Sequence, residues 1–269
     1  GSRTAAARVA AAIDLAQIHG AHLTGLCLAV EPPVPATVFG LMPPDLLTSQ
    51  RKAVLEQAET AMAQFRFAVE TAGLLGEGRI VQAPDLDAAD VFIQHVRHAD
   101  LVILSQTDPE EMSPLRSELT TDILMGGGRP AIVIPYIGPA RTLGQRVLVA
   151  WDGGREAARA VNDSLCTLAA RAFRDCAVSQ PRCFGQRRPA RARCRHLAAP
   201  RPPRRQSGGA RTVARETSIG DVILADIADN SIDLLVMGAY GHSRLRELVL
   251  GGVTRHLLAH MTVPVLMSH

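Results

Sequence analysis

The 269-residue chain has little that would support a disulfide framework, a membrane span or an aromatic surface. Its five cysteines include no C-x-x-C pair, which argues against a disulfide scaffold. No apolar run approaches the roughly 20 residues that cross a bilayer, and the first twenty residues have the rhythm of an amphipathic helix, not of a signal peptide. Aromatic residues make up 3% of the chain. We therefore expect a cytoplasmic, globular protein with reduced thiols.

Acidic residues are nearly absent from residues 172–211. This interval holds eleven arginines and one acid, Asp175, so its net charge is +10 against +3 for the whole chain, and the remainder is acidic. Such a run could neutralise nucleic-acid phosphates. Only Phe173 and Phe184 are available there for base stacking, so we do not expect a nucleic-acid partner.

The same interval is rich in proline and has no apolar period of 2 or 3.6 residues, so we expect neither a strand nor a helix in it. The chain has one lysine, Lys52, which is typical of a GC-rich gene. One hypothesis is that the interval is an out-of-frame translation whose sense resumes near Arg211. Sequencing an independent clone would test it.

Elsewhere, helical and strand patterns alternate. Glycines Gly20 and Gly73 stand where two of the helices should end. Continuous apolar runs predict buried strands, and strands alternating with helices predict a parallel, helix-covered α/β sheet. The expected helices are 3–19, 46–72 and 87–97, and the expected strands are 22–30, 78–83, 100–106, 129–135, 146–151, 233–237 and 263–268.

The pattern occurs twice. GSRTAAARVA at Gly1 matches GGREAARAVN at Gly153, and DLVILSQTD at Asp100 matches DLLVMGAYG at Asp233. We therefore expect two tandem domains, residues 1–137 and 145–269. The strand RVLVA that opens the second has no counterpart ahead of Gly1, so we expect the first sheet to lack its opening strand. Each unit's last strand could pair with another, within one chain or between two.

A glycine-bearing turn follows the strand DLLVM in the second unit. Gly238, Gly241 and Gly251 have the spacing G-x2-G-x9-G, and Gly252 opens a helix. A glycine turn that leads into a helix N-terminus offers backbone amides to an anion. Neither the P-loop nor the dinucleotide fingerprint is present. Tight turning alone is the alternative reading of these glycines.

At these residues the chain resembles the universal stress protein family in its tandem-domain form. The resemblance implies two Rossmann-like (HUP-type) domains, each an open parallel sheet of about five strands, and ATP binding with or without Mg²⁺ in a stress-related role. The family's motif ends in Ser or Thr, where this chain has Gly252. The cofactor-binding residues that it implies are Asp152, Gly238, Gly241, Ser243, Arg244, Gly251, Gly252, Val253 and Thr254.

Asp152 follows the first strand of the second unit, where the family's nucleoside-contacting Asp stands. An alternative for Asp152 is a helix cap. In the first unit, Ser105 and Asp108 replace Gly238 and Gly241, and two glutamates follow Asp108, so we expect no ATP there. That unit would serve as a partner surface.

Catalytic and metal sites are not expected. No nucleophile, base and orienting acid come together in the sequence, so we expect no enzyme activity. His256 and His260 lie four apart on an expected helix, but no nearby carboxylate or cysteine completes a metal site. The function expected first is an ATP-binding stress protein that is a homo-oligomer or an intrachain pseudo-dimer. The alternative is a regulatory scaffold that binds no nucleotide.

Overall fold

The computed structural model describes residues 3–31, 44–84, 87–107, 114–137, 143–168, 175–179, 218–240 and 252–269. Helices and strands alternate along these segments, as the sequence predicts. In the first half of the chain they are α1 (Arg3–His19), β1 (Leu23–Glu31), α3 (Pro44–Thr71), β2 (Gly76–Pro84), α4 (Ala88–Val96), β3 (Val102–Ser105), α5 (Pro114–Gly126) and β4 (Ala131–Ile134).

The second half repeats the order of strands and helices. It contains β5 (Arg146–Ala150), α6 (Arg155–Leu168), β6 (Asp175–Ser179), α7 (Ile219–Asp229), β7 (Leu234–Gly238), α8 (Gly252–His260) and β8 (Val265–Ser268). Gly20 and Gly73 follow α1 and α3 with positive φ, as expected for helix ends. The helix expected from Asp87 forms, but the Asp87 side chain makes no capping hydrogen bond.

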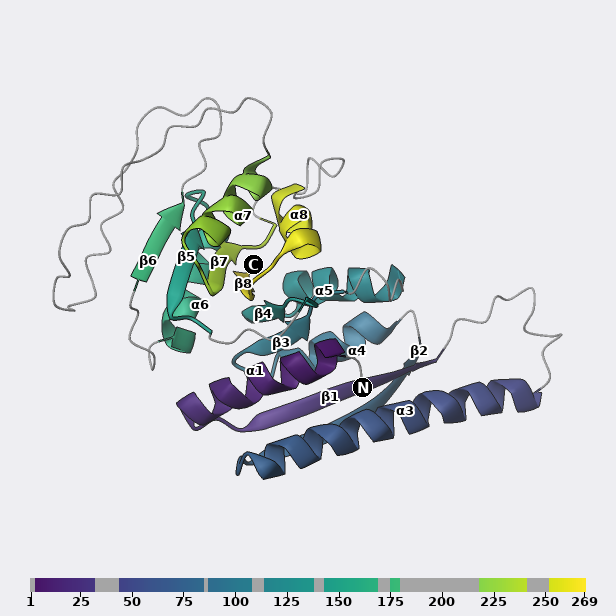
Figure 1. Cartoon of the computed structure of the whole chain (residues 1–269). Coiled ribbons are helices and arrows are strands. Elements are labelled where there is room, and N and C mark those ends of the chain that lie inside the picture. Colours follow the sequence, from purple (N-terminus) through teal and green to yellow (C-terminus); the bar gives the residue numbers. More distant parts are fainter. Residues whose placement is uncertain are drawn as a thin grey trace.

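A six-stranded sheet joins the two halves among the described residues. Its order is β3-β4-β8-β7-β5-β6, and all neighbours are parallel except β4 and β8. β4 and β8 are the last strands of the two expected units, and they pair antiparallel with Ile132 opposite Leu266. The pairing of last strands, anticipated from the sequence, is therefore present within one chain (Figure 1).

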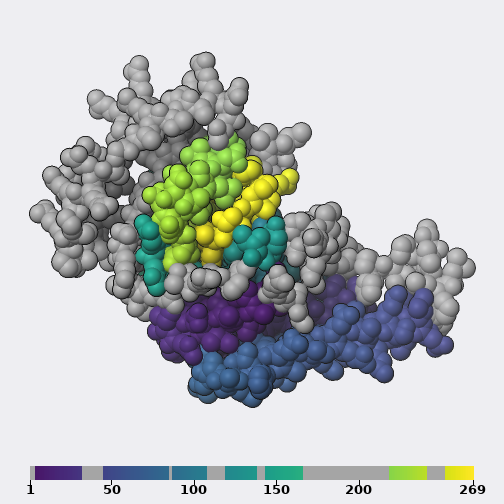
Figure 2. All heavy atoms as spheres, in the orientation of Figure 1, coloured from purple at the N-terminus to yellow at the C-terminus, as the bar shows by residue number. Residues whose placement is uncertain are grey.

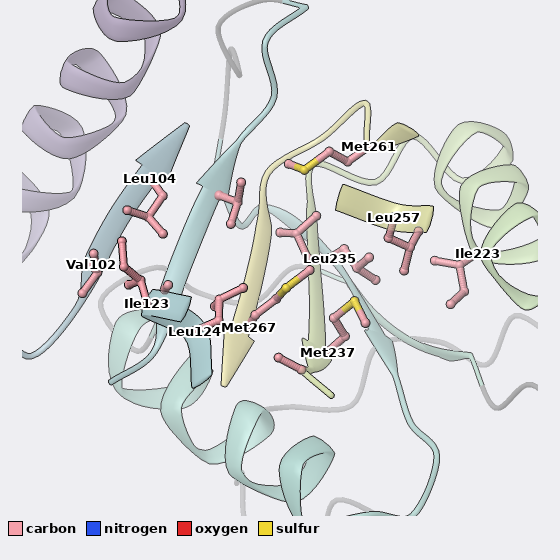
Figure 3. Close-up of a cluster of buried hydrophobic side chains, with 14 of the residues drawn as sticks. Val102, Leu104, Ile123, Leu124, Ile223, Leu235, Met237, Leu257, Met261 and Met267 are labelled. Carbon is pink, nitrogen blue, oxygen red and sulfur yellow. The ribbon is translucent and has the colours of Figure 1, made fainter. Parts of the chain in front are cut away.

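Helices cover both faces of this sheet. Side chains of β4, β5, β7 and β8 alternate between two buried clusters, as period-2 strands require. One cluster includes Ala7 of α1 and Ala160 of α6, and the other includes residues of α4, α5, α7 and α8. Figure 3 shows the second cluster, in which Met237, Met267 and Leu257 lie together. The α/β fold expected from the sequence is thus confirmed.

The strands of the first half do not form one sheet. β1 and β2 make a separate two-stranded parallel sheet, and α3 packs on it. Figure 2 shows α3 in blue along one side of the molecule, next to α1 in purple. The strands expected in one sheet of the first unit therefore lie in two separate sheets.

The interval 172–211 does contain a strand, contrary to our expectation. β6 (Asp175–Ser179) pairs in parallel with β5, so that Val149 lies opposite Val178. Its sequence, DCAVS, is short and follows closely on arginines, which is why the apolar pattern was missed. The second unit thus has the strand that the repeat requires next to β5. Residues 180–217 lie outside the described residues.

Polar side chains connect the halves. Gln106 Nε2 donates to the carbonyl oxygens of Leu258 and Ala259, and Gln106 Oε1 accepts from the amide of Tyr136. Arg159 of α6 donates to the carbonyl oxygen of Gly128 in the first half, at 2.7 Å. The halves therefore share hydrogen bonds as well as a sheet and a core.

Within the described residues, none of the helices has the combined length and hydropathy of a membrane span.

Candidate functional site

The carboxyl ends of β5 and β7 meet at one edge of the sheet. The two strands are parallel neighbours, with Ala150 opposite Met237, so Asp152 and Gly238 leave the sheet side by side. Helix α6 begins just after Asp152. This edge of a parallel sheet is where α/β proteins bind ligands. The structure thus brings together two of the residues that the sequence assigned to the site.

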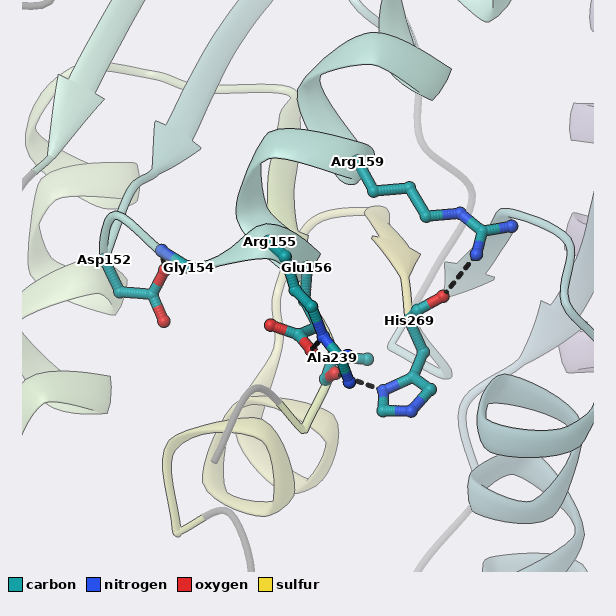
Figure 4. A network of polar contacts seen from close by, with 7 residues as sticks. All are labelled: Asp152, Gly154, Arg155, Glu156, Arg159, Ala239 and His269. Atoms are coloured by element: carbon teal, nitrogen blue, oxygen red, sulfur yellow. Dashed lines mark hydrogen bonds and ion pairs between the residues drawn. The ribbon is translucent and has the colours of Figure 1, made fainter. Parts of the chain in front are cut away.

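Asp152 is held in a tight turn and its side chain is exposed. Its Oδ1 accepts a hydrogen bond from the amide of Gly154 at 2.7 Å, and Gly153 between them has a φ of 84° (Figure 4). The bond goes to the residue before α6, so Asp152 shapes the entry into that helix. No described residue is hydrogen-bonded to Oδ2, which leaves this oxygen available to a ligand.

Gly238 has a packing reason to be glycine. A Cβ added at Gly238 would lie 2.6 Å from the amide nitrogen of Ala157 and 2.7 Å from the carbonyl carbon of Glu156. Backbone atoms at that distance cannot move aside cheaply. The start of α6 therefore approaches β7 so closely that only glycine fits, whether or not a ligand binds.

Helix α8 begins at Gly252, which no described side chain covers. Gly252 is exposed, and a Cβ added there would meet nothing within 4 Å. Val253 packs against the core, and Thr254 is 4% exposed, with its Oγ1 accepting from the amide of Tyr240 at 3.5 Å. The Thr254 hydroxyl is thus directed to Tyr240, whereas the first amides of α8 lack intrahelical partners.

The remaining predicted site residues, Gly241, Ser243, Arg244 and Gly251, lie outside the described residues. Tyr240, the last described residue before them, has a φ of 53°, and its hydroxyl lies 3.0 Å from Thr121 Oγ1 of α5. A residue of the first half therefore positions the start of the glycine turn.

A buried carboxylate beside the site was not predicted. Glu156, in the first turn of α6, is 5% exposed and pairs with the exposed guanidinium of Arg155 (Figure 4). Burial pushes the pKa of Glu156 upward, but Arg155, the backbone amide of Glu156 and His269 outweigh burial, so the pKa lies below its usual value. His269 is in turn held by the carbonyl oxygen of Ala239 at 2.9 Å. Glutamate is common in the first turn of a helix, so nothing in the sequence indicated that Glu156 would be buried.

In the first half, a polar side chain occupies the place of Gly238. Ser105, at the end of β3, accepts from Arg8 Nη1 at 3.0 Å, and its Oγ lies 3.4 Å from the carbonyl oxygen of Thr4, to which it donates. Arg8 and Thr4 belong to α1, which aligns in sequence with α6. The Ser105 side chain thus contacts α1, whereas Gly238 approaches the backbone of α6 too closely for a side chain. That the first unit binds no ATP stays a prediction. Asp108 lies outside the described residues.

His256 and His260 have partners that explain their positions. His256 Nε2 lies 2.8 Å from Asp221 Oδ1 of α7, and His260 Nδ1 lies 2.9 Å from the carbonyl oxygen of His256. His256 therefore connects α8 to α7, whereas His260 bonds within α8. In the part of the chain that the structure describes, no three His, Cys, Asp or Glu residues are placed to hold a metal ion.

The model of the universal stress protein family matches residues 188–269. Over these residues the chain is similar to the universal stress protein family. The match begins inside the arginine-rich interval and includes β7, the glycine turn, α8 and β8, but not β5 or Asp152. It supports a stress-related role.

Two solved structures and one curated protein are similar to this chain. A universal stress protein of Synechocystis is 58% identical over 38 residues, which are 14% of this chain and 13% of that protein. The crystal structure of a universal stress protein from Archaeoglobus fulgidus aligns with a TM-score of 0.63 and 14% identity, over 97% of this chain and 92% of that one. This likeness shows that the described residues of both halves share the fold of that protein. A functionally unknown protein from Pseudomonas aeruginosa aligns with a TM-score of 0.49, 9% identity and 94% coverage of both chains.

Proposed function

We propose that this chain is a universal stress protein that binds ATP at the edge formed by β5, β7 and the N-terminus of α8. The observation that carries the proposal is the start of α8 at the exposed Gly252, where an added Cβ would meet none of the described residues within 4 Å and the first helix amides lack intrahelical partners. The exposed carboxylate of Asp152 leaves the same edge one strand away. The glycine spacing from Gly238 to Gly251 is the third support.

The backbone amides and Asp152 would each contact a different part of ATP. Amides at the start of α8 and along the glycine turn would face the phosphates, because the helix dipole and free N–H groups favour negative charge. Asp152 Oδ2 would accept a hydrogen bond from a sugar hydroxyl, while Oδ1 keeps the turn closed. We propose binding without catalysis.

Gly252 offers a test that separates ligand binding from folding. Gly252→Asp puts a carboxylate at the N-terminus of α8, which favours the helix but repels phosphate. We expect this variant to melt no lower than the parent chain and to bind a fluorescent ATP analogue at least about tenfold more weakly. Gly252→Ser adds the hydroxyl that the family motif has at this place, and we expect tighter binding than in the Gly252→Ala control.

A second candidate is a regulatory scaffold that binds no nucleotide. Two observations favour it: the close packing that already explains Gly238, and the buried negative charge of Glu156 beside the edge. Equilibrium titration of the intact chain with the ATP analogue distinguishes the two. An absence of saturable binding, or equal affinity in the Gly252→Asp and Gly252→Ser variants, would favour the scaffold.

A further inference from the structure

Glu156 is a buried carboxylate that the proposed ATP site does not use. It lies in the first turn of α6 and is 5% exposed. Burial raises the pKa of its carboxyl, but the hydrogen bonds from Arg155 and from the amide of Glu156 itself outweigh burial, so the pKa lies below its usual value and the group is charged at neutral pH. Glu156 therefore places a fixed negative charge beside the edge at which β5 and β7 end.

The carboxylates of Glu156 and Asp152 border one position. A Cβ added at Gly154 would lie 3.0 Å from Asp152 Oδ1, 3.3 Å from Asp152 Oδ2 and 3.4 Å from Glu156 Oε2. Figure 4 shows Gly154 between these two side chains. Negative charge from two residues therefore disfavours a phosphate group in front of Gly154.

Backbone amides at the start of α6 are already engaged. The amide of Gly154 donates to Asp152 Oδ1 at 2.7 Å, and the amide of Glu156 bonds to the carboxylate of its own side chain. The amide nitrogen of Ala157 lies against β7, because a Cβ added at Gly238 would be 2.6 Å from it. Free amides and the helix dipole attract anions to a helix N-terminus. Helix α6 therefore offers little to a phosphate.

Helix α8 differs from α6 in both respects. Its first turn contains no acidic residue, and a Cβ added at Gly252 would meet none of the described residues within 4 Å. The edge thus has one helix start that repels phosphate and one that can bind it. A ligand with an anionic end and a neutral end is therefore favoured in one orientation, with its neutral end at Asp152 and α6.

We infer that Glu156 is a specificity-determining residue, which selects nucleotides whose ribose carries no phosphate on its 2′ or 3′ oxygen. The inference rests on the proposed function. With a sugar hydroxyl bound to Asp152 Oδ2, a phosphate on that sugar would lie next to the carboxylates of Asp152 and Glu156. In dinucleotide-binding α/β folds, an acidic residue likewise accompanies a free ribose hydroxyl, whereas an arginine accompanies a 2′-phosphate.

Two nucleotides that each carry two phosphates test the inference. ADP carries both on its 5′ oxygen, whereas adenosine 3′,5′-bisphosphate carries one of them on the 3′ oxygen. Each competes with the bound fluorescent ATP analogue, and we expect the parent chain to bind ADP at least about tenfold more tightly. Equal affinities would overturn the inference and leave the ATP site standing. Failure of the analogue and of both nucleotides to bind would overturn the ATP site and the inference together.

Two variants should change this preference in opposite directions. Glu156→Gln keeps the shape of the side chain but removes its charge and releases the Arg155 guanidinium, so we expect the preference for ADP to fall at least about threefold. Arg155→Gln leaves the Glu156 charge without its partner, so the preference should rise. The Arg155 side chain is 87% exposed, so its replacement should leave the fold intact.

Glu59→Gln, on the exposed face of α3, is the matched control, because it removes the same charge outside the site. The preference is a ratio of two affinities measured on one sample, so partial unfolding of a variant does not alter it. If Glu156→Gln does not fold, Arg155→Gln alone decides. An unchanged preference in the variants of residues 155 and 156, or an equal change in Glu59→Gln, would overturn the inference.

Discussion

Gln106 Nε2 donates to the carbonyl oxygen of Leu258 at 2.9 Å, so a side chain just after β3 satisfies the last turn of α8. The second N–H of this amide reaches the carbonyl oxygen of Ala259 at 3.1 Å, and Gln106 is 4% exposed. The first half of the chain therefore supplies the cap of a helix that begins at the candidate site in the second half.

Replacing the buried Gln106 with Ala should destabilise the protein by about 1–3 kcal/mol, because the carbonyl oxygens of Leu258 and Ala259 lose their donor in two part-buried hydrogen bonds. Urea unfolding measures the change. Gln57→Ala on the exposed face of α3 is the matched control, and we expect it to change stability by less than about 0.5 kcal/mol. Equal effects at the two positions would show that the Gln106 bonds contribute nothing to stability.

Gly238→Ala should be poorly tolerated and Gly252→Ala well tolerated. The first places a Cβ 2.6 Å from the backbone of α6, which predicts a loss of about 1–3 kcal/mol, or failure to fold. The second adds a better helix former in open space, which predicts a gain of up to about 1 kcal/mol. Thermal unfolding of the two variants compares them. A stable Gly238→Ala protein would contradict the close approach of α6 to β7.

The free energy of unfolding should fall as the pH is lowered, because Asp221 becomes protonated. Its pKa is held below the usual value, chiefly by the hydrogen bond from the Ser218 hydroxyl and also by His256. A depressed carboxyl pKa contributes stability above the unfolded-state pKa, near 4, and loses that contribution as the pH falls through the folded-state value.

Asp221→Asn should therefore lower stability at pH 6 and converge with the parent chain below about pH 3 to 4. Denaturant unfolding at a series of pH values checks this. The exposed Asp229→Asn at the end of α7 is the control. A constant difference between Asp221→Asn and the parent at all pH values would argue against the ionised carboxylate as the cause.

Asp152→Asn should distinguish the role of Asp152 in the turn from its proposed role in ligand binding. An amide oxygen can still accept from Gly154, so we expect unchanged thermal stability within about 0.5 kcal/mol. If Asp152 binds the sugar of a nucleotide, affinity for the ATP analogue should fall about tenfold, which corresponds to 1.4 kcal/mol. Unchanged affinity would remove Asp152 from the proposed site.

Much of the fold follows from local patterns. Continuous apolar runs such as the one at Leu234 identify buried strands, and the left-handed glycines Gly20 and Gly73 end helices where expected. β6 was missed because its short apolar stretch, Cys176–Val178, lies close to arginines. α5 had no strong apolar period, and its existence depends on packing of residues such as Ile123 in the joint core.

The site was predictable only in part. The parallel order of strands places Asp152 near Gly238, and strand order can be inferred from the repeat. The sequence could not show why position 238 requires glycine, because this depends on how closely α6 approaches β7. The burial of Glu156 likewise depends on tertiary packing, which residue spacing does not contain.

The antiparallel pairing of β4 with β8 means that backbone hydrogen bonds hold the two halves together. Cleavage of the peptide link around residues 138–142 would leave two fragments still held by interstrand ladder bonds and by interleaved side chains such as Ile132 and Leu266. A nicked molecule should accordingly migrate as one particle under native conditions. Damage to the first half should therefore also affect the edge of the second half at which α8 begins.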